Sequence, residues 1–413
     1  MEEWNQDRLI DILETLIDYR GKTPRKISFG IPLITAKIVK NGRIETPSEF
    51  LPIEDYESWM VRGFPKIGDV LLTTEAPLGE VAQVNDEKIA LAQRIVCLRG
   101  KKDILDNTFL KYYFLSPKGK AKLKARETGT TVTGIKQSEL KEMLIDYPSS
   151  NVQKQITSIL SSLDNKIELN RRINENLEQQ AQALFKAWFV DFEPFKDRKF
   201  VDSELGMIPE GWTVGTIGDY CKIRSGFAFK SSWWTDKGVK VVKIKNISSS
   251  GNLDMNDCSY VNKENILRAQ EFSLKSGDLL IAMTGATIGK FCIVPVLKEA
   301  MYVNQRVGKF FLGENPILKV PFIYGLLKSE NIISQIINKG QGSAQPNISA
   351  NDIETISIIL PPKDIISKYN ELVSPYFSLL IKNLNECDYL ARLRDTLLPK
   401  LMSGELKIND LSI

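Results

Sequence analysis

Histidine is absent from the 413-residue chain. Because histidine is the commonest general base and a frequent metal ligand, its absence excludes histidine-dependent catalytic triads and most zinc and non-haem iron sites. A hydrolase that carries out its own chemistry is therefore not expected.

Cysteine and long apolar runs are also scarce. The five cysteines are odd in number and far apart, which excludes a disulfide framework and a CxxC metal or redox site, so we expect reduced, buried thiols. No run approaches the roughly 20 apolar residues that span a bilayer. The first residues, MEEWNQDRL, are acidic where a secretory signal is basic and then apolar. We expect a cytoplasmic protein.

Motifs for nucleotide binding and methyl transfer are missing as well. Gly285 and Gly289 are separated by three residues, where a phosphate-binding loop has four. The only Pro-Pro pair, Pro361-Pro362, is followed by lysine and not by the aromatic residue expected of an amino-methyltransferase. These absences indicate a binding module whose chemistry, if any, belongs to partners.

The charge is nearly balanced, with 55 Lys plus Arg against 51 Asp plus Glu and a net charge of +4. This is weak evidence for a nucleic-acid partner. Two local basic clusters are more informative, and each either contacts phosphates or forms a solvated face. The clusters are Arg20, Lys22, Arg25 and Lys26, and Lys118, Lys120, Lys122, Lys124 and Arg126.

An internal repeat organises the chain. Trp4 matches Trp212 and Asn170 matches Asn383, so the offset grows from 208 to 213 residues along the repeat. The segments GDVLL and GDLLI correspond, and so do the two Gln-Arg pairs at 93–94 and 305–306. A chain of this length also exceeds the roughly 250 to 300 residues of one core, so a tandem duplication of domains is expected.

Each repeat begins with short alternating or β-branched runs separated by Gly, Pro, Asn and Asp. This pattern is typical of a mainly β domain with long surface loops. One packed helix is expected in each domain, over residues 107–125 and 320–338, which share an apolar helical period.

A heptad period follows each β domain and predicts a long helix. Two such amphipathic helices need a partner for their apolar stripes, so they pair either within one chain, antiparallel, or between chains, parallel. Asn170 and Asn383, at equivalent positions of the stripe, are suited to fixing register. The predicted seam comprises Ile156, Leu160, Leu163, Ile167, Asn170, Leu177, Leu184, Tyr369, Val373, Tyr376, Leu380, Asn383, Leu390 and Leu397.

The sequence resembles the specificity subunit of type I restriction-modification systems over essentially all 413 residues. The resemblance is carried by QKQITSILSSLDNKIELNRRINENLEQQAQALFKAWFVDF after the first β domain and LRDTLLPKLMSGELKI at the end. The GD turns, the Gln-Arg pairs and the proline before each long helix add to it. The combination is specific, although each short match is weak alone.

The resemblance implies an α+β fold. Two mainly β target-recognition domains with small helices are separated by two long helices, which form an intramolecular antiparallel coiled coil with pseudo-twofold symmetry. The expected divisions are target-recognition domain 1 at 1–150, the first spacer helix at 151–190, a linker at 191–211, target-recognition domain 2 at 212–363, the second spacer helix at 364–402 and a tail at 403–413.

The function implied is non-catalytic reading of double-stranded DNA, with each recognition domain reading half of a bipartite, asymmetric site. The helices set the spacer and dock two methyltransferase subunits, and an endonuclease or translocase subunit joins through the complex. No cofactor is expected on this chain, because S-adenosylmethionine, ATP and magnesium belong to the partner subunits. Two other classes remain open: a coiled-coil scaffold that binds proteins and not DNA, and a magnesium-dependent nuclease.

Polar residues in loops and at strand ends are the candidates for contacting DNA, because Arg, Lys, Asn and Gln read base edges and phosphates. In the first domain they are Lys22, Arg25, Lys37, Thr74, Arg94, Thr130, Thr131 and Lys136. In the second they are Lys230, Lys243, Lys245, Thr284, Lys290, Gln305, Arg306, Gln341, Ser343, Gln345 and Asn347. No catalytic residue and no metal ligand is predicted.

Overall fold

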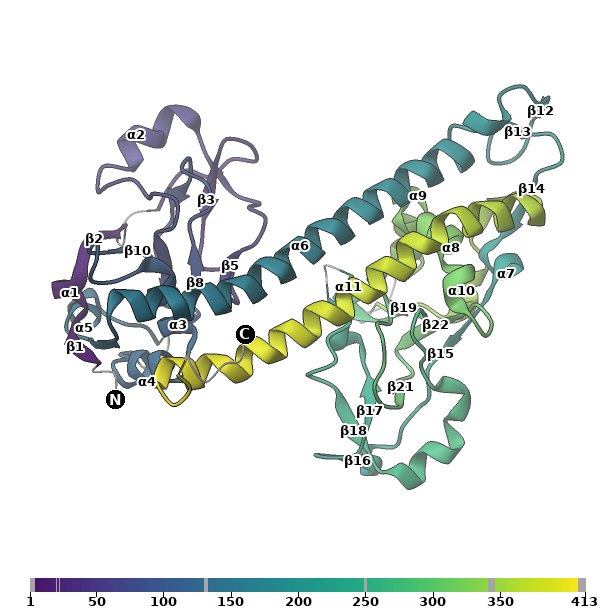
Figure 1. The fold of residues 1–413 in the computed structure, drawn as a ribbon. Coiled ribbons are helices and arrows are strands. Elements are labelled where there is room, and N and C mark those ends of the chain that lie inside the picture. The colour runs from purple at the N-terminus through teal and green to yellow at the C-terminus, as the bar shows by residue number, and fades with distance from the viewer. Residues whose placement is uncertain are drawn as a thin grey trace. The chain divides into compact units, whose positions relative to one another are not determined.

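The computed structural model describes residues 4–19, 21, 23–129, 133–248, 251–340 and 346–407. The chain divides into two compact units, whose elements are labelled in Figure 1. Unit 1 comprises Met1–Lys166 with Leu390–Ile413, and unit 2 comprises Ile167–Tyr389. None of the helices in the described ranges combines the length and the apolar character needed to cross a membrane. The expected boundaries of the recognition domains stay a prediction.

Unit 1 is built on a four-stranded antiparallel sheet in the order β2-β10-β7-β8. A second, smaller sheet has the strand order β6-β3-β9, and its strands β3 and β9 are parallel. Two strand pairs, β1-β11 and β4-β5, and the short helices α1, α2 and α5 lie in the same unit, together with two longer helices described below. The bounds are β1 Asn5–Arg8, α1 Leu9–Ile12, β2 Leu13–Asp18, β3 Ile31–Ile34, β4 Val39–Lys40, β5 Arg43–Ile44, β6 Phe50–Leu51, α2 Tyr56–Trp59, β7 Val70–Thr74, β8 Leu78–Gln83, β9 Ala90–Leu91, β10 Ile95–Gly100, α5 Gln137–Lys141 and β11 Leu144–Tyr147.

Unit 2 repeats this topology. Its four-stranded antiparallel sheet has the order β15-β22-β19-β20, and its second sheet, β16-β18-β17-β21, again contains one parallel pair, β17 with β21. The duplication expected from the sequence is therefore present in the strand order. The bounds are β12 Phe200–Val201, β13 Ile208–Pro209, β14 Thr213–Thr216, α7 Ile217–Tyr220, β15 Lys222–Ser225, β16 Trp234–Thr235, β17 Val239–Val242, β18 Ser259–Val261, β19 Leu279–Ala282, β20 Phe291–Ile293, β21 Met301–Val303, β22 Val307–Phe311, α10 Ala350–Glu354 and β23 Ser357–Leu360.

The central sheet of each unit is apolar on both faces. Along β7, Val70 and Leu72 belong to one buried cluster and Leu71 to another, because successive side chains of a strand point to opposite faces. In unit 2, Leu279 and Leu280 divide in the same way. One face packs against helices and the other against the second sheet.

The two GD turns have a structural role. Gly68 and Gly277 each adopt φ +87°, a left-handed conformation that favours glycine. The next residue, Asp69, pairs with Arg99 at 2.6 Å, whereas Asp278 pairs with Lys309 at 2.7 Å. The buried aspartate is thus neutralised in both units, although the cation comes from a different position of the neighbouring strand.

The single packed helix expected in each domain is wrong, because each segment forms two helices. Residues 107–125 contain α3 (Asn107–Leu115) and α4 (Pro117–Ala125), and the second copy contains α8 (Val320–Lys328) and α9 (Glu330–Lys339). Ser116 interrupts the first copy in an extended conformation and caps α4 by accepting a hydrogen bond from Gly119 N–H at 3.1 Å. Proline then follows at the first helical position, where its missing N–H costs nothing.

The two long helices predicted from the heptads are α6 (Ser150–Phe189) and α11 (Lys363–Ser403). Within unit 2 they run antiparallel, since Asn170 contacts Glu386 while the hydroxyl of Tyr369 donates to the carbonyl of Ala181. In unit 1, the start of α6 shares a buried cluster with the last turns of α11, which lie beside α4 (Figure 1). Antiparallel pairing within one chain, and the α+β class, are confirmed.

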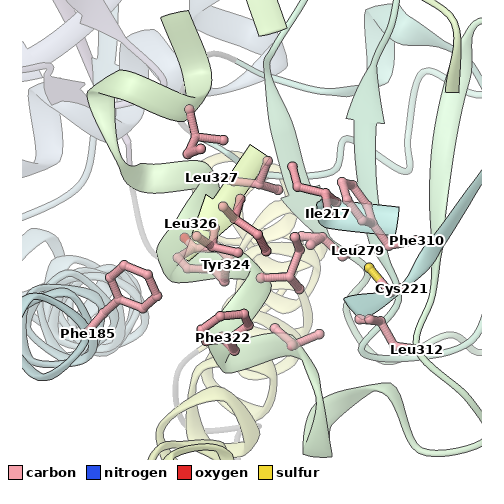
Figure 2. Close-up of a cluster of buried hydrophobic side chains, with 14 of the residues drawn as sticks. Phe185, Ile217, Cys221, Leu279, Phe310, Leu312, Phe322, Tyr324, Leu326 and Leu327 are labelled. Atoms are coloured by element: carbon pink, nitrogen blue, oxygen red, sulfur yellow. The ribbon is translucent and has the colours of Figure 1, made fainter. Parts of the chain in front are cut away.

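Aromatic side chains join the long helices to unit 2. Phe185 of α6 points at α8 in Figure 2, among Phe322, Tyr324 and Leu326. Gly325 makes this approach possible, because a Cβ built there would lie 2.2 Å from the Phe185 ring. The helix therefore packs directly against backbone at this point.

The corresponding junction of unit 1 is ionic. The carboxylate of Asp164 in α6 lies 3.5 Å from Lys111 of α3 and 2.8 Å from Arg394 of α11. By the repeat offset of 213 residues, Lys111 corresponds to Tyr324 and Asp164 to Phe377. The rings of Tyr324 and Phe377 are 5.0 Å apart in unit 2. The two units thus close the same joint with different chemistry.

The charge state of Asp164 depends on these neighbours. Burial alone raises the pKa of Asp164, but Lys111, a hydrogen bond from the Tyr112 hydroxyl at 2.7 Å and Arg394 outweigh it and hold the pKa below its usual value. Burial is also the main cause that lowers the pKa of Lys111. The carboxylate is therefore the counter-charge that keeps two cations tolerable in this joint.

Replacing Asp164 with asparagine should lower the free energy of unfolding of unit 1 by about 3 kcal/mol at neutral pH, because Lys111 and Arg394 lose their shared counter-charge. Since the folded pKa of Asp164 is depressed, this stabilisation is complete above an unfolded pKa of about 4 and is lost as the pH falls through the folded value. Urea unfolding at pH 7 and pH 3 should show a larger difference between the wild type and Asp164→Asn at pH 7 than at pH 3.

Asp395→Asn is the matched control, because its carboxylate lies 2.8 Å from Arg394 but is 62% exposed. An exposed pair contributes about 1 kcal/mol or less. Equal losses in the two variants would contradict the ionic joint.

Candidate nucleic-acid interface

Five segments of unit 1 converge on one pocket of about 260 Å³. Two of them leave the ends of adjacent parallel strands: Thr35–Lys37 follows β3, Ala92–Arg94 follows β9, and Ala92 N–H donates to Ile34 carbonyl at 2.9 Å. Parallel strands end at the same edge of a sheet, which brings these loops together. The pocket is lined by Thr23, Pro24, Lys26, Thr35, Ala36, Lys37, Glu49, Ala76, Ala92, Gln93 and Arg94. It therefore unites two predicted residues, Lys37 and Arg94.

Arg94 is held in an uncommon backbone conformation. Its φ of +77° lies in the left-handed region, and its carbonyl accepts a hydrogen bond from Thr74 N–H at 2.9 Å. Its Nε lies 2.8 Å from Glu75 Oε1. The guanidinium is thus directed by both the turn and a carboxylate, and it remains 48% exposed.

Unit 2 presents an equivalent turn. Asn304 N–H donates to the carbonyl of Val242 at 2.9 Å, and Met283 N–H donates to the carbonyl of Arg306 at 3.0 Å. These bonds correspond to those made by Ala92 and Thr74 in unit 1. Gln305 and Arg306 are both exposed at this turn. The two Gln-Arg pairs found in the sequence therefore occupy the same place in their units.

Lysines and tryptophans gather near the same edge of unit 2. Lys243 Nζ lies 3.5 Å from the centre of the Trp234 ring, and Lys230 lies 5.6 Å from that of Trp233. Burial lowers the pKa of Lys243, and neighbouring Lys245 lowers it further. Lys243 and Lys245 belong to a turn after β17 and not to the strand itself. Sequence reasoning missed the tryptophans, although the pair Trp233-Trp234 beside Lys230 was a visible signal.

The other predicted residues are distributed between surface and core. Arg25 pairs with Glu54 at 2.6 Å and Lys245 with Asp257 at 2.8 Å, so both are partly neutralised. Thr74 and Thr284 are 1% exposed and cannot reach a base edge in this conformation, and the Thr74 hydroxyl has no hydrogen-bond partner within the described ranges. Lys136 and Asn347 are exposed and Lys290 is half-buried. Lys22, Thr130, Thr131, Gln341, Ser343 and Gln345 lie outside the described residues.

The second basic cluster is largely occupied within unit 1. Lys118 and Lys122 of α4 lie 3.1 and 2.5 Å from Asp146. Burial alone raises the pKa of Asp146, but hydrogen bonds led by that from Lys122 lower it to about 2. Arg126 pairs with Glu139 at 3.1 Å. This helix therefore offers less free positive charge than its sequence indicates.

The predicted seam residues are all at least half-buried. Asn383 donates to the Asn174 side-chain oxygen at 2.8 Å, and Asn174 donates to the carbonyl of Leu380 at 3.2 Å. Asn170 instead donates to Glu386 at 2.7 Å. Those that are buried are Ile156, Leu160, Ile167, Asn170, Tyr369, Val373, Leu380 and Asn383, and those half-buried are Leu163, Leu177, Leu184, Tyr376, Leu390 and Leu397.

The type I restriction modification DNA specificity domain matches residues 1–179 and 209–386. The MjaIX specificity subunit of Methanocaldococcus jannaschii, a type I restriction enzyme subunit, is 31% identical over 99% of this chain and 95% of its own length. The chain belongs to this family. A second specificity subunit of that organism, MjaVIII, is 27% identical over all of this chain and 95% of its own length.

The fold of this specificity-subunit chain is also similar to a solved one. The crystal structure of the S subunit of a type I restriction-modification system from M. genitalium matches with a TM-score of 0.56 at 17% identity, covering 97% of this chain and 96% of that one. At this identity the match concerns the fold alone.

The Asn174–Asn383 pair of this specificity-subunit chain generates a stability prediction. Asn383→Leu should lower the free energy of unfolding of unit 2 by about 1 to 3 kcal/mol, because the buried amide of Asn174 loses its partner. The double variant Asn174→Leu/Asn383→Leu should recover most of that loss, since two apolar side chains leave no unsatisfied group. Denaturant unfolding of the two single variants and the double variant measures the coupling, and additive losses would contradict it.

Proposed function

We propose that each unit of this DNA specificity subunit reads one half of a bipartite, asymmetric site in double-stranded DNA. The observation that carries this proposal is the pair of equivalent Gln-Arg turns, each set at the edge of the same sheet topology but among different side chains. Arginine and glutamine are side chains that read guanine and adenine in the major groove. Similar frames with different neighbours suit two different half-sites.

The long helices α6 and α11 are proposed to set the spacer and to dock two methyltransferase subunits. Large apolar side chains remain on their outer surfaces: Leu169 is 51% exposed, Leu372 48% and Tyr389 56%. Exposed apolar side chains on these helices favour protein docking. An endonuclease or translocase subunit joins through the same complex.

The chain itself is proposed to be non-catalytic. The absence of histidine supports this, since the usual general base is missing. S-adenosylmethionine, ATP and magnesium then act on the partner subunits, and methylation of adenine is the reaction that this chain directs.

Co-expression with the methyltransferase subunit of the same system, followed by genome-wide mapping of methylated adenines, tests the proposal. The expected result is one motif made of two specified parts with a fixed unspecified gap. A continuous motif, or methylation without sequence preference, would contradict the reading by two separate units.

Arg94→Ala and Arg306→Ala should each weaken binding of the complex to cognate duplex DNA by about 1 to 3 kcal/mol if the guanidinium contacts a base. Each variant should relax the motif in one half only. Competition binding at fixed salt is the measurement, because the phosphate contribution depends strongly on salt.

Arg43→Ala and Arg268→Ala are matched controls. Both arginines are exposed, and neither lies at a Gln-Arg turn. Each substitution removes one positive charge from its unit, as Arg94→Ala and Arg306→Ala do. They should change affinity slightly and leave the motif intact. An unchanged motif in Arg94→Ala and Arg306→Ala would remove these arginines from the interface.

A further inference from the structure

Position 75 of unit 1 and position 284 of unit 2 have the same backbone surroundings. Glu75 forms an isolated bridge with Gly134, and Thr284 forms one with Asn347. The next residue has a left-handed backbone conformation in both copies, with φ +48° at Ala76 and φ +69° at Gly285. The two side chains therefore occupy equivalent places beside their Gln-Arg turns.

Their chemistry differs. Glu75 is paired with Arg94, and both are open to solvent, with 36% and 48% of their side chains exposed. Thr284 instead donates to the side-chain oxygen of Asn347 at 3.0 Å and is 1% exposed. Within the described ranges, no carboxylate pairs with Arg306. Unit 1 thus offers donors and an acceptor at its turn, whereas unit 2 offers a guanidinium without a carboxylate.

The carboxylate of Glu75 has little structural value. An ion pair this exposed contributes about 0 to 1 kcal/mol to stability. Next to DNA phosphates the same carboxylate would be repelled, because both groups are negatively charged. Its place at a turn that borders the pocket becomes favourable when it faces an N–H donor on the edge of a base.

One base pair supplies both kinds of partner. In the major groove, guanine presents two acceptors, O6 and N7, and the cytosine paired with it presents the N4 amino donor. A guanidinium has five N–H donors, so an ion pair through Nε leaves others for guanine. A carboxylate beside it can accept from cytosine N4.

We infer that Glu75 is a specificity-determining residue of unit 1, and that the Glu75–Arg94 pair reads one G·C base pair, with Arg94 donating to guanine and Glu75 accepting from cytosine N4. Unit 2 has Arg306 for guanine but no equivalent acceptor, so its half-site lacks this cytosine contact. The inference deepens the proposed function and rests on it.

The test uses the full chain in complex with its methyltransferase subunit. Wild-type, Glu75→Thr and Glu75→Gln complexes each select duplexes from a random library, and Glu45→Thr is the control. Glu45 is in the same unit, 39% exposed, and pairs with Lys40 at 3.5 Å, so its loss removes a similar exposed ion pair. Thermal unfolding of each complex checks that the variants remain folded.

The expected result is that the wild type and Glu45→Thr select a G·C pair in one half-site. In Glu75→Thr and Glu75→Gln, the preference at that pair falls by about 10-fold while the other half-site is unchanged. Glu75→Thr gives unit 1 the residue that unit 2 has at the equivalent position, Thr284. Glu75→Gln keeps the size of the side chain and removes its charge.

Base analogues separate direct reading from mere positioning of Arg94. Placing N4-methylcytosine at the selected pair fills the exposed amino position, and should weaken wild-type binding about 10-fold but leave Glu75→Thr unaffected. Replacing guanine by 7-deazaguanine should weaken both. Equal sensitivity of both proteins to N4-methylcytosine would overturn the role of Glu75 as a base reader.

The result also distinguishes this inference from the proposed function. A bipartite wild-type motif that is unchanged in Glu75→Thr overturns the inference and leaves the proposed function standing. Selection of no sequence by the wild type overturns both.

Discussion

Both units depend on burying the apolar stripes of α6 and α11. An isolated helix of this kind is marginal in water, and its stability comes from the surface that it packs against. In unit 1, Leu160 near the start of α6 and Leu401 near the end of α11 enter one core. In unit 2, Phe185 near the end of α6 and Tyr369 near the start of α11 enter another. Each core is therefore completed by segments that are far apart in the chain.

This constraint separates framework from variable surface within each unit. The face of the central sheet that carries Val70 and Leu72, or Leu279 in the second copy, is committed to the helices. The opposite face packs under the second sheet, whose parallel strands deliver the loops with the Gln-Arg turns. Loop residues can differ between the units because they contribute little to the helix-facing core.

Few unpaired cations remain among the described members of the two basic clusters. Most of these members are paired inside their own unit, as Lys122 is with Asp146 and Arg25 with Glu54. A chain with a net charge of +4 has no strong general positive field, so under the proposed function its DNA affinity would come from a few turns. The proposed function therefore gives the exposed arginines at those turns a large weight in recognition.

The sequence alone determined the duplication, the two long helices and the mainly β character of the repeats, whereas the periodicity of the helices left antiparallel and parallel pairing open and only the family resemblance favoured the antiparallel one. These features follow from local periodicity and from internal repetition, both of which are legible along the chain. Ser116-Pro117 is a typical helix-start signal, but the apolar period continues across it and led to the prediction of one helix.

Only the tertiary structure decided which loops meet and which charges pair. Lys37 and Arg94 line one pocket because β3 and β9 are parallel neighbours, although more than 50 residues separate them. Glu75 and Arg94 pair although they come from two different loops, and Asp164 and Arg394 pair across 230 residues. Such contacts depend on strand order and helix docking, which are set by the burial of whole faces, and no local pattern around either partner encodes them.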